Sequence, residues 1–209
     1  MLMSLLLLAA FETHAAPPPV PGLCTAPVPA DRDTPGCYQT NIVELGEDFD
    51  TLYWHIFEFQ NEAAAAAEAK KHHLAAVTTV HGRTWLYVLG VEKEAVEGGV
   101  RRAAIGPLDV PEGNVTAHFS EAIFPPGMRT RVHSHPGPEA FYVVEGEQCM
   151  ETPTEKQKLA AGTSYIVRAG PHLQAAPRGR RNLVLILAPS GQPFVIPGSD
   201  WKSTGFCDD

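Results

Sequence analysis

The chain has 209 residues and carries 24 acidic against 16 basic side chains, a formal net charge of −8. Nucleic-acid-binding proteins are ordinarily basic because they neutralise phosphates, so this balance argues against nucleic acid as a partner. Hydrophobic residues at 44% and charged residues at 19% are close to globular averages and argue against wholesale disorder. The 18 glycines and 19 prolines favour turn-rich β structure over a helical bundle.

The N-terminal segment, residues 2–11, is nearly all apolar and is followed by small residues and then by Pro17. A run of about 10 residues is too short to cross a bilayer, which takes roughly 17 to 25. It is typical of a secretory signal peptide, which we expect over residues 1–16 with cleavage near residue 15. No Lys or Arg precedes the run, so a loose apolar N-terminus stays the alternative. The chain is thus expected to be secreted or periplasmic, without a stable membrane span.

The chain has four cysteines, and none of them forms a C-x-x-C pair. An even number of cysteines in an oxidising compartment suggests two disulfides. A bridge between Cys24 and Cys37 would restrain a Pro-rich stretch, and one between Cys149 and Cys207 would tie the C-terminal tail to the body. Four cysteines allow three connectivities, between which the sequence does not choose, and buried or free thiols are the alternative.

Residues 17–35 are rich in proline and predict a linker or an extended arm. A small β-α-β-β unit is expected over residues 36–99. Its first strand is rich in aromatic side chains, and Asn61 is the expected N-cap of the helix that follows. A hairpin around His81, Gly82 and Arg83 completes the unit. The expected elements are a strand at residues 52–59, a helix at residues 62–71, and strands at residues 76–80 and 84–89.

From residue 100 onward short apolar stretches are separated by Gly and Pro, a spacing typical of small all-β sandwiches and barrels. We expect a barrel over residues 100–200 and a C-terminal tail at residues 201–209. The strongest candidate strands of the barrel are residues 115–124, 140–145, 164–168 and 183–188.

A cluster of metal-ligand residue types lies at the centre of this second part of the chain. His133 and His135 are two apart, so on a strand both imidazoles face the same side. Glu139 follows the segment Pro136-Gly137-Pro138, which can bend the chain and bring a carboxylate back alongside. Imidazoles with a carboxylate suit Fe(II), Mn, Cu, Ni or Zn. A fourth ligand would have to come from another strand, and His172 is the candidate.

The spacing of these residues resembles the first signature motif of the cupin superfamily, with Gly127, His133, His135, Glu139 and Gly146 all at matching positions. The segment from Gly162 to His172 is similar to the second motif, Pro-x-Gly-x-x-His-x-x-x-Asn. It departs from that motif in three ways: Arg168 stands at the Pro position, His172 follows Gly170 by one residue fewer, and Ala176 stands at the Asn position.

The resemblance implies a mainly β fold: a double-stranded β-helix, the cupin or jelly-roll barrel, preceded here by the β-α-β-β unit. It implies that His133, His135, Glu139 and His172 bind one divalent transition metal and leave positions open for water or substrate. It also implies that Gly127 and Gly146 end the strands that carry the ligands. Because cupins often dimerise through barrel edges, a homodimer is a further expectation.

Three residues are candidates for the wall of a substrate pocket. Arg131 shares strand parity with the two histidines and could hold an anionic substrate. Phe141 and Val143 share parity with Glu139, itself the candidate catalytic residue, and are expected to form an apolar wall. The run of arginines at residues 178–181 is interpreted as a solvated turn rather than as an anion-binding site.

Three functions fit these residues. The leading one is a metalloenzyme acting on a small organic molecule, with dioxygenase chemistry on a phenol, flavonol or thiol, or Lewis-acid isomerisation or decarboxylation by Zn or Mn. The second is a non-catalytic module that binds a metal or a small ligand. The third makes the metal structural and the β-α-β-β unit a partner-binding surface. The fold hosts many activities, so resemblance alone does not select one.

Overall fold

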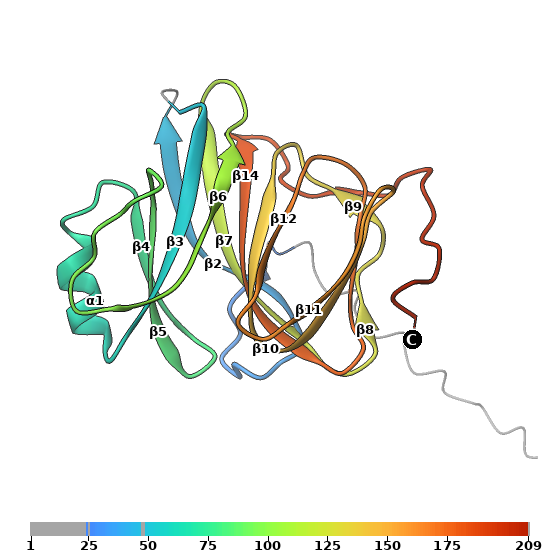
Figure 1. Ribbon diagram of the computed structural model, residues 1–209, viewed down its shortest axis with the longest axis horizontal. Coiled ribbons are helices and arrows are strands. Elements are labelled where there is room, and N and C mark those ends of the chain that lie inside the picture. Colours follow the sequence, from blue (N-terminus) through green and yellow to red (C-terminus); the bar gives the residue numbers. More distant parts are fainter. Residues whose placement is uncertain (1–23, 25, 47–48, 209) are drawn as a thin grey trace, which may run out of the picture.

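The computed structural model describes residue 24 and residues 26–46 and 49–208; the expected signal peptide lies outside them. This part of the chain is mainly β (Figure 1), and the jelly-roll barrel preceded by a β-α-β-β unit is confirmed. The elements are β1 (Ala26–Pro27), β2 (Gly36–Gly46), β3 (Thr51–Phe59), α1 (Glu62–Ala69), β4 (Ala75–Val80), β5 (Arg83–Gly90), β6 (Val100–Asp109), β7 (Val115–Phe124), β8 (Met128–Arg129), β9 (His133–Ser134), β10 (Glu139–Glu151), β11 (Lys156–Ala160), β12 (Ser164–Val167), β13 (Leu173–Ala176), β14 (Arg180–Pro189) and β15 (Ile196–Pro197).

The long strand β10 connects the two faces of the barrel. Its first half pairs with β14 and β12, and its second half pairs with β11 and β13. The register shifts between Val143 and Glu145, where a β-bulge lets the strand bend from one sheet into the other. Gly146 follows this bulge inside β10, so the expectation that Gly146 ends the strand is wrong.

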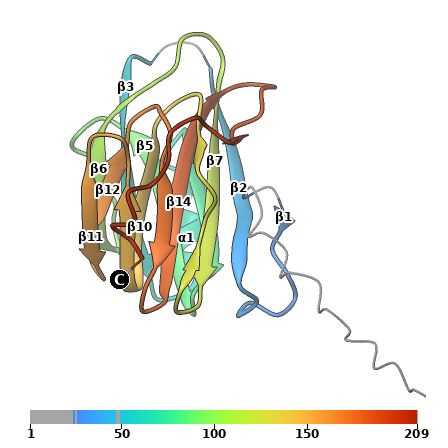
Figure 2. The ribbon, with the colours of Figure 1, turned by 90° about the vertical axis from the view of Figure 1, so that its right-hand side faces the viewer.

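The barrel sheet has the strand order β1-β2-β7-β14-β10-β13-β8. Figure 2 shows β1 and β2 at one edge of this sheet, beyond β7. Alternate side chains point into the barrel, where they form an apolar core that supports the metal-ligand residues from below. Its largest members are Phe124, Phe141, Met150 and Phe194.

A second sheet, with the order β4-β5-β3-β6, packs against the outer face of the barrel sheet. The contact is aromatic: the ring of Phe119 on β7 lies 5.0 Å from Tyr87 and 6.0 Å from Trp54, centroid to centroid. All three side chains are at most 1% exposed. The helix α1 covers the other face of this sheet through Ala65. From left to right in Figure 1, the layers are therefore the helix α1, the sheet β4-β5-β3-β6 and the barrel.

Local chemistry explains the first unit. Asn61 accepts a hydrogen bond from the Ala64 amide at 2.9 Å, the N-cap contact expected from the sequence. The turn between β4 and β5 places His81 and Gly82 at φ values of 53° and 69°. Two consecutive positive φ angles match the tight hairpin turn that suits the twist of the strands.

Two strands pair across the expected domain boundaries. β2 lies in the range expected for the first unit but pairs with β7 of the barrel sheet. β6 lies in the range expected for the barrel but pairs with β3. The domain boundaries expected between residues 35 and 36 and between residues 99 and 100 stay a prediction. Each of the two parts thus contributes one strand, β2 or β6, to the sheet of the other part.

The four cysteines form two disulfides, Cys24–Cys37 and Cys149–Cys207, which is one of the three connectivities that the sequence left open. The first ties the arm before β2 to the barrel edge, and the second ties the C-terminal segment to β10. Within the described ranges, no helix has the length and apolarity needed to cross a membrane.

Candidate metal centre

The four expected ligands come from three neighbouring segments. His133 is on β9, His135 follows it, Glu139 begins β10, and His172 immediately precedes β13. His133 and His172 are held together by a pair of backbone hydrogen bonds of 3.1 and 2.9 Å. The bend before Glu139 depends on Gly137, where a Cβ atom would lie 2.3 Å from the Leu187 carbonyl oxygen.

Each imidazole has one nitrogen fixed by a backbone carbonyl. Nδ1 of His133 donates to Arg131 at 2.8 Å, Nδ1 of His135 donates to Phe194 at 2.5 Å, and Nδ1 of His172 donates to Gly170 at 3.1 Å. A carbonyl only accepts, so Nδ1 carries the proton and Nε2 keeps its lone pair. Orientation of ligand histidines by such bonds is the usual outer shell of a metal site.

The free nitrogens converge. Ligand atoms of His133, His135 and His172 all lie within 4.8 Å of one another. Among the described residues, Nε2 of His135 and Nε2 of His172 are buried and have no hydrogen-bond partner. A buried acceptor without a partner costs free energy, and a metal ion bound by the three lone pairs would remove that cost. These residues could hold a metal ion.

Glu139 lies beside this cluster. Its Oε2 is 3.2 Å from Nε2 of His172 and 3.6 Å from Nε2 of His135, and the residue is 3% exposed. Burial acts to raise the pKa of this carboxyl, but the neighbouring imidazoles of His135 and His172 act in the opposite direction and hold the pKa well below its usual value. The carboxylate is therefore held in its ionised form beside the three histidines.

The environment of His133 favours its neutral form. Burial, with smaller repulsive contributions from His172 and His135, lowers the pKa of His133 to about 4 despite the attraction of Glu139. Since only a neutral imidazole binds a metal, this histidine is ready to act as a ligand over the neutral pH range.

A buried polar network lies behind Glu139, and the sequence analysis missed all of it. Nε2 of Gln174 donates to both carboxylate oxygens of Glu139, at 2.8 and 2.7 Å. Oε1 of Gln174 accepts from Nε2 of Gln148 at 3.1 Å and from Nη2 of Arg180 at 3.0 Å. The interpretation of residues 178–181 as a solvated turn is wrong at Arg180, which is 4% exposed because β14 begins there and points it into the barrel.

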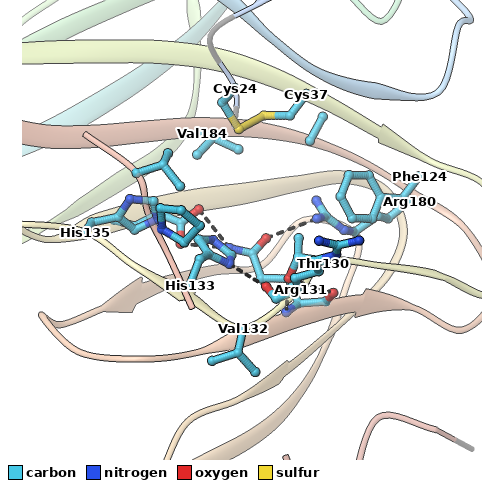
Figure 3. Close-up of a pocket in the computed structure, with 15 residues that line it drawn as sticks. Cys24, Cys37, Phe124, Thr130, Arg131, Val132, His133, His135, Arg180 and Val184 are labelled. Carbon is cyan, nitrogen blue, oxygen red and sulfur yellow. Dashed lines mark hydrogen bonds and ion pairs between the residues drawn. A yellow bond between two sulfur atoms is a disulfide. The ribbon is translucent and has the colours of Figure 1, made fainter. Parts of the chain in front are cut away.

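A cavity of about 170 Å³ opens onto this centre (Figure 3). Its polar side carries His133, His135 and Glu139 together with Gln174 and Arg180. Its apolar side includes the Cys24–Cys37 disulfide, drawn at the top of Figure 3. The lining residues of the apolar side are Cys24, Cys37, Ala122, Phe124, Val132, Val184, Val195 and Pro197.

The three residues expected in a substrate pocket fall in different places. Arg131 lines the cavity and is exposed, but it lies between β8 and β9 rather than on a strand, so strand parity is not what orients it. Phe141 and Val143 are fully buried in the barrel core and are not among the residues that line the cavity.

Residues 120–187 match the family model described as a cupin domain. The chain therefore contains a cupin domain, as the motif around His133 indicated, and that domain carries all four candidate ligands. A search of curated proteins found no relative that matches the chain.

Solved structures are similar to part of the chain. A cupin superfamily protein from Desulfitobacterium hafniense is 19% identical, with 34% of this chain and 67% of that chain covered, at a TM-score of 0.34. A cupin-2 domain protein from Shewanella frigidimarina is 21% identical, with 35% and 70% covered, at 0.31. An oxalate oxidase in complex with the substrate analogue glycolate is 18% identical, with 38% and 45% covered, at 0.33. No activity is inferred from likeness at this level.

Proposed function

We propose that this chain binds one divalent transition-metal ion through His133, His135, His172 and Glu139, and that it is a metalloenzyme acting on a small organic molecule. The observation that carries the proposal is the convergence of three imidazoles within 4.8 Å, with Nε2 of His135 and His172 buried and without a partner among the described residues. Fe, Mn, Cu, Ni and Zn all suit such a donor set.

A redox-active ion bound here would supply a position for O₂ and for an oxygen or sulfur atom of a substrate, which makes a dioxygenase-type reaction the leading candidate. Zn or Mn would instead supply Lewis acidity for isomerisation or decarboxylation. The volume of about 170 Å³ favours a small substrate over a flavonol, since pockets for drug-sized ligands usually exceed about 300 Å³.

The chain's own residues would bind, orient and shield the substrate. Among the described residues that line the cavity, Glu139 is the one carboxylate, and its low pKa keeps it ionised. We propose it as the catalytic residue in addition to its role as a ligand. The apolar side of the cavity would exclude water, with Phe141 and Val143 supporting that wall from the core. Arg131 at the cavity rim would steer a substrate of negative charge.

Metal analysis of the purified protein tests this proposal. We expect about one metal ion per chain for a single site, strong loss of metal in His133→Ala, and full retention in His73→Ala, which changes an exposed histidine outside the site. Oxygen uptake is then measured with catechols and thiols, and it should disappear with the metal. Absence of metal in protein taken from its native compartment, with unchanged metal uptake in His133→Ala, would contradict the site.

The alternative function is a non-catalytic module that holds a metal or a small ligand. Stoichiometric metal without turnover of any tested substrate would favour it. Both readings keep the same four ligands, so the metal measurement precedes the activity measurement.

We further propose that the protein works outside the reducing cytosol. All four cysteines are bridged in two disulfides, which is compatible with an oxidising compartment. N-terminal analysis of the mature protein from culture medium or periplasm tests this, with cleavage expected near residue 15. A homodimer stays a proposal as well, tested by light scattering of the purified protein.

A further inference from the structure

Arg180 is a cation buried inside the barrel. It is 4% exposed, and its guanidinium lies 4.0 Å from the centre of the Phe124 ring. Nη2 donates to Gln174 at 3.0 Å, and Nη1 lies 2.6 Å from the side-chain amide of Asn182. Nε is buried and, within the described part of the chain, has no hydrogen-bond partner.

Arg180 also lacks a carboxylate partner. Its neighbours Arg178 and Arg181 each form ion pairs, with Glu147 and with Glu145 respectively. No described carboxylate lies within 4.0 Å of Arg180, because Gln174 stands between it and Glu139. Glu139 attracts Arg180 from beyond Gln174 but does not contact it. A buried charge that no opposite charge contacts costs free energy, so this position favours a bound anion.

The shape of the chain keeps Arg180 in this place. Gly146 has a φ of 76°, and a Cβ atom there would lie 2.0 Å from the Gly179 carbonyl oxygen and 3.0 Å from Cα of Arg180. Only glycine at residue 146 lets β10 approach the start of β14 this closely. The last glycine of the first motif therefore serves to place Arg180 rather than to end a strand.

Arg180 and three of the candidate metal ligands, His133, His135 and Glu139, line the same cavity. In Figure 3 the histidines lie at one end and Arg180, stacked on Phe124, lies at the other, with the disulfide above. The cavity thus offers a cation at one end, metal-ligating nitrogens at the other, and apolar side chains along one wall. A short molecule with a carboxylate at one end and an oxygen donor at the other matches this order.

We propose that Arg180 binds the carboxylate of a small organic acid whose second oxygen reaches the histidine cluster. The inference rests on the proposed metal-dependent function and names its substrate class. The guanidinium, which lines the cavity, forms charge-assisted hydrogen bonds to the carboxylate, and Phe124 fixes the plane of the guanidinium.

A purely positioning role for Arg180 makes different predictions. In that case it would only orient Gln174, and through Gln174 the carboxylate of Glu139. Its removal would then weaken metal binding but would not change the preference for acids over neutral analogues of equal size. The preference for a charged over an uncharged small molecule therefore separates carboxylate binding by Arg180 from a positioning role, whereas a loss of activity does not.

The test uses the full chain, both metal-loaded and metal-free, in calorimetric titrations with 3-hydroxypropanoate and its uncharged amide. We expect the acid to bind about 10- to 100-fold more tightly than the amide, the range for hydrogen bonds to a charged group. Arg180→Gln should remove this preference, whereas the matched control Arg178→Gln, at an 82% exposed side chain, should keep it. Inorganic phosphate is titrated in parallel, and a preference for phosphate over the acid overturns the choice of carboxylate.

A measurement on the unmodified protein covers the case in which Arg180→Gln does not fold. The Nε–H signal of Arg180 in nitrogen-15 spectra should shift on addition of the acid and stay in place with the amide. Equal binding of acid and amide, or a preference that survives in Arg180→Gln, overturns the proposal. If metal binds in full but the acid does not, the inference fails and the proposed metal site stands. If no metal binds, the metal site fails, and the acid–amide comparison on the metal-free protein still decides the role of Arg180.

Discussion

Gln174 grips Glu139 through a single nitrogen, with Nε2 at 2.8 Å from one carboxylate oxygen and 2.7 Å from the other. The backbone of Gln174 is itself fixed by Thr130. The backbone N–H of Gln174 donates to Oγ1 of Thr130 at 3.0 Å, and the backbone carbonyl of Gln174 accepts from the backbone N–H of Thr130 at 2.8 Å. The plane of the Glu139 carboxylate is therefore fixed before any metal ion binds, which is what a preorganised metal site requires.

Gln174→Met removes this grip while keeping the volume of the side chain. We expect the metal dissociation constant to rise about 10- to 100-fold, the usual effect of losing a group that orients a ligand. Competition with a metal chelator measures it. Gln192→Met, at an exposed position, is the control and should leave the constant unchanged. An unchanged constant in Gln174→Met would show that Glu139 needs no support.

The aromatic contact between Tyr87 and Phe119 predicts that the two sheets unfold together. Phe119 is 1% exposed and stacks on Tyr87 at 5.0 Å, so Phe119→Ala should lower the free energy of unfolding by about 3–5 kcal/mol. Urea unfolding followed by tryptophan fluorescence and by circular dichroism should give one coincident transition.

The control for this contact is Val91→Ala, whose side chain belongs to a residue 68% exposed and should change stability by less than about 0.5 kcal/mol. Two separate transitions in the unmodified protein would contradict the picture of a shared core. So would a loss in Phe119→Ala as small as that of the control.

The Cys149–Cys207 disulfide closes a loop with a sequence separation of 58. The chain-entropy treatment assigns such a loop about 4 kcal/mol of stabilisation, against about 3 kcal/mol for the separation of 13 between Cys24 and Cys37. Double alanine variants of each pair, compared by urea unfolding, should lose stability in that order. The reverse order would indicate that the first bridge stabilises mainly through native contacts at the cavity wall.

Local patterns in the sequence were sufficient to predict several of the elements, among them α1, β3, β4, β5 and β7, and to single out the histidines that the fold brings together. Asn61 capped the expected helix because capping depends on only the first turn of that helix. His133, His135 and Glu139 lie within seven residues, so their spacing alone indicated a shared site. His172 was the candidate for a fourth ligand from another strand, and the backbone pairing of His133 with His172 brings these two side chains together.

The support of Glu139 was missed because it depends on register between distant strands. Gln148, Gln174 and Asn182 lie on β10, β13 and β14, and a single sequence does not show how those strands pair. One signal was present: Arg180 and Asn182 share strand parity with Val184, which points into the barrel, whereas Leu183 faces the other sheet. Because residues 178–181 were interpreted as a turn, this parity was not applied to Arg180.

The exchange of edge strands was not predictable for a similar reason. β6 is exposed at most positions, and β2 mixes buried, intermediate and exposed residues; neither pattern specifies which sheet a strand joins. The pairing of β2 with β7 is instead a long-range contact that forms only in the folded chain.

A buried histidine outside the metal site predicts a dependence of stability on pH. The side chain of His81 is fully buried, and burial lowers its pKa to about 4, even though its hydrogen bond with the Asn182 carbonyl acts in the opposite direction. The unfolded chain has the ordinary value near 6.5. Between these two values the unfolded chain takes up a proton that the folded chain refuses, so the free energy of unfolding falls as the pH is lowered.

His81→Asn removes this titration and keeps a residue that tolerates the φ of 53° at this turn. The unmodified protein should lose up to about 3 kcal/mol more than the variant between pH 7 and pH 4, from the span of the two pKa values. Burial raises the pKa of Glu121, 3.8 Å from His81, which offsets part of the loss in both proteins. Urea unfolding at several pH values measures the difference, with His73→Asn as an exposed control that should follow the unmodified protein. Parallel curves for His81→Asn and the unmodified protein would show that His81 is protonated in the folded state, which would place a charged imidazole against Glu121.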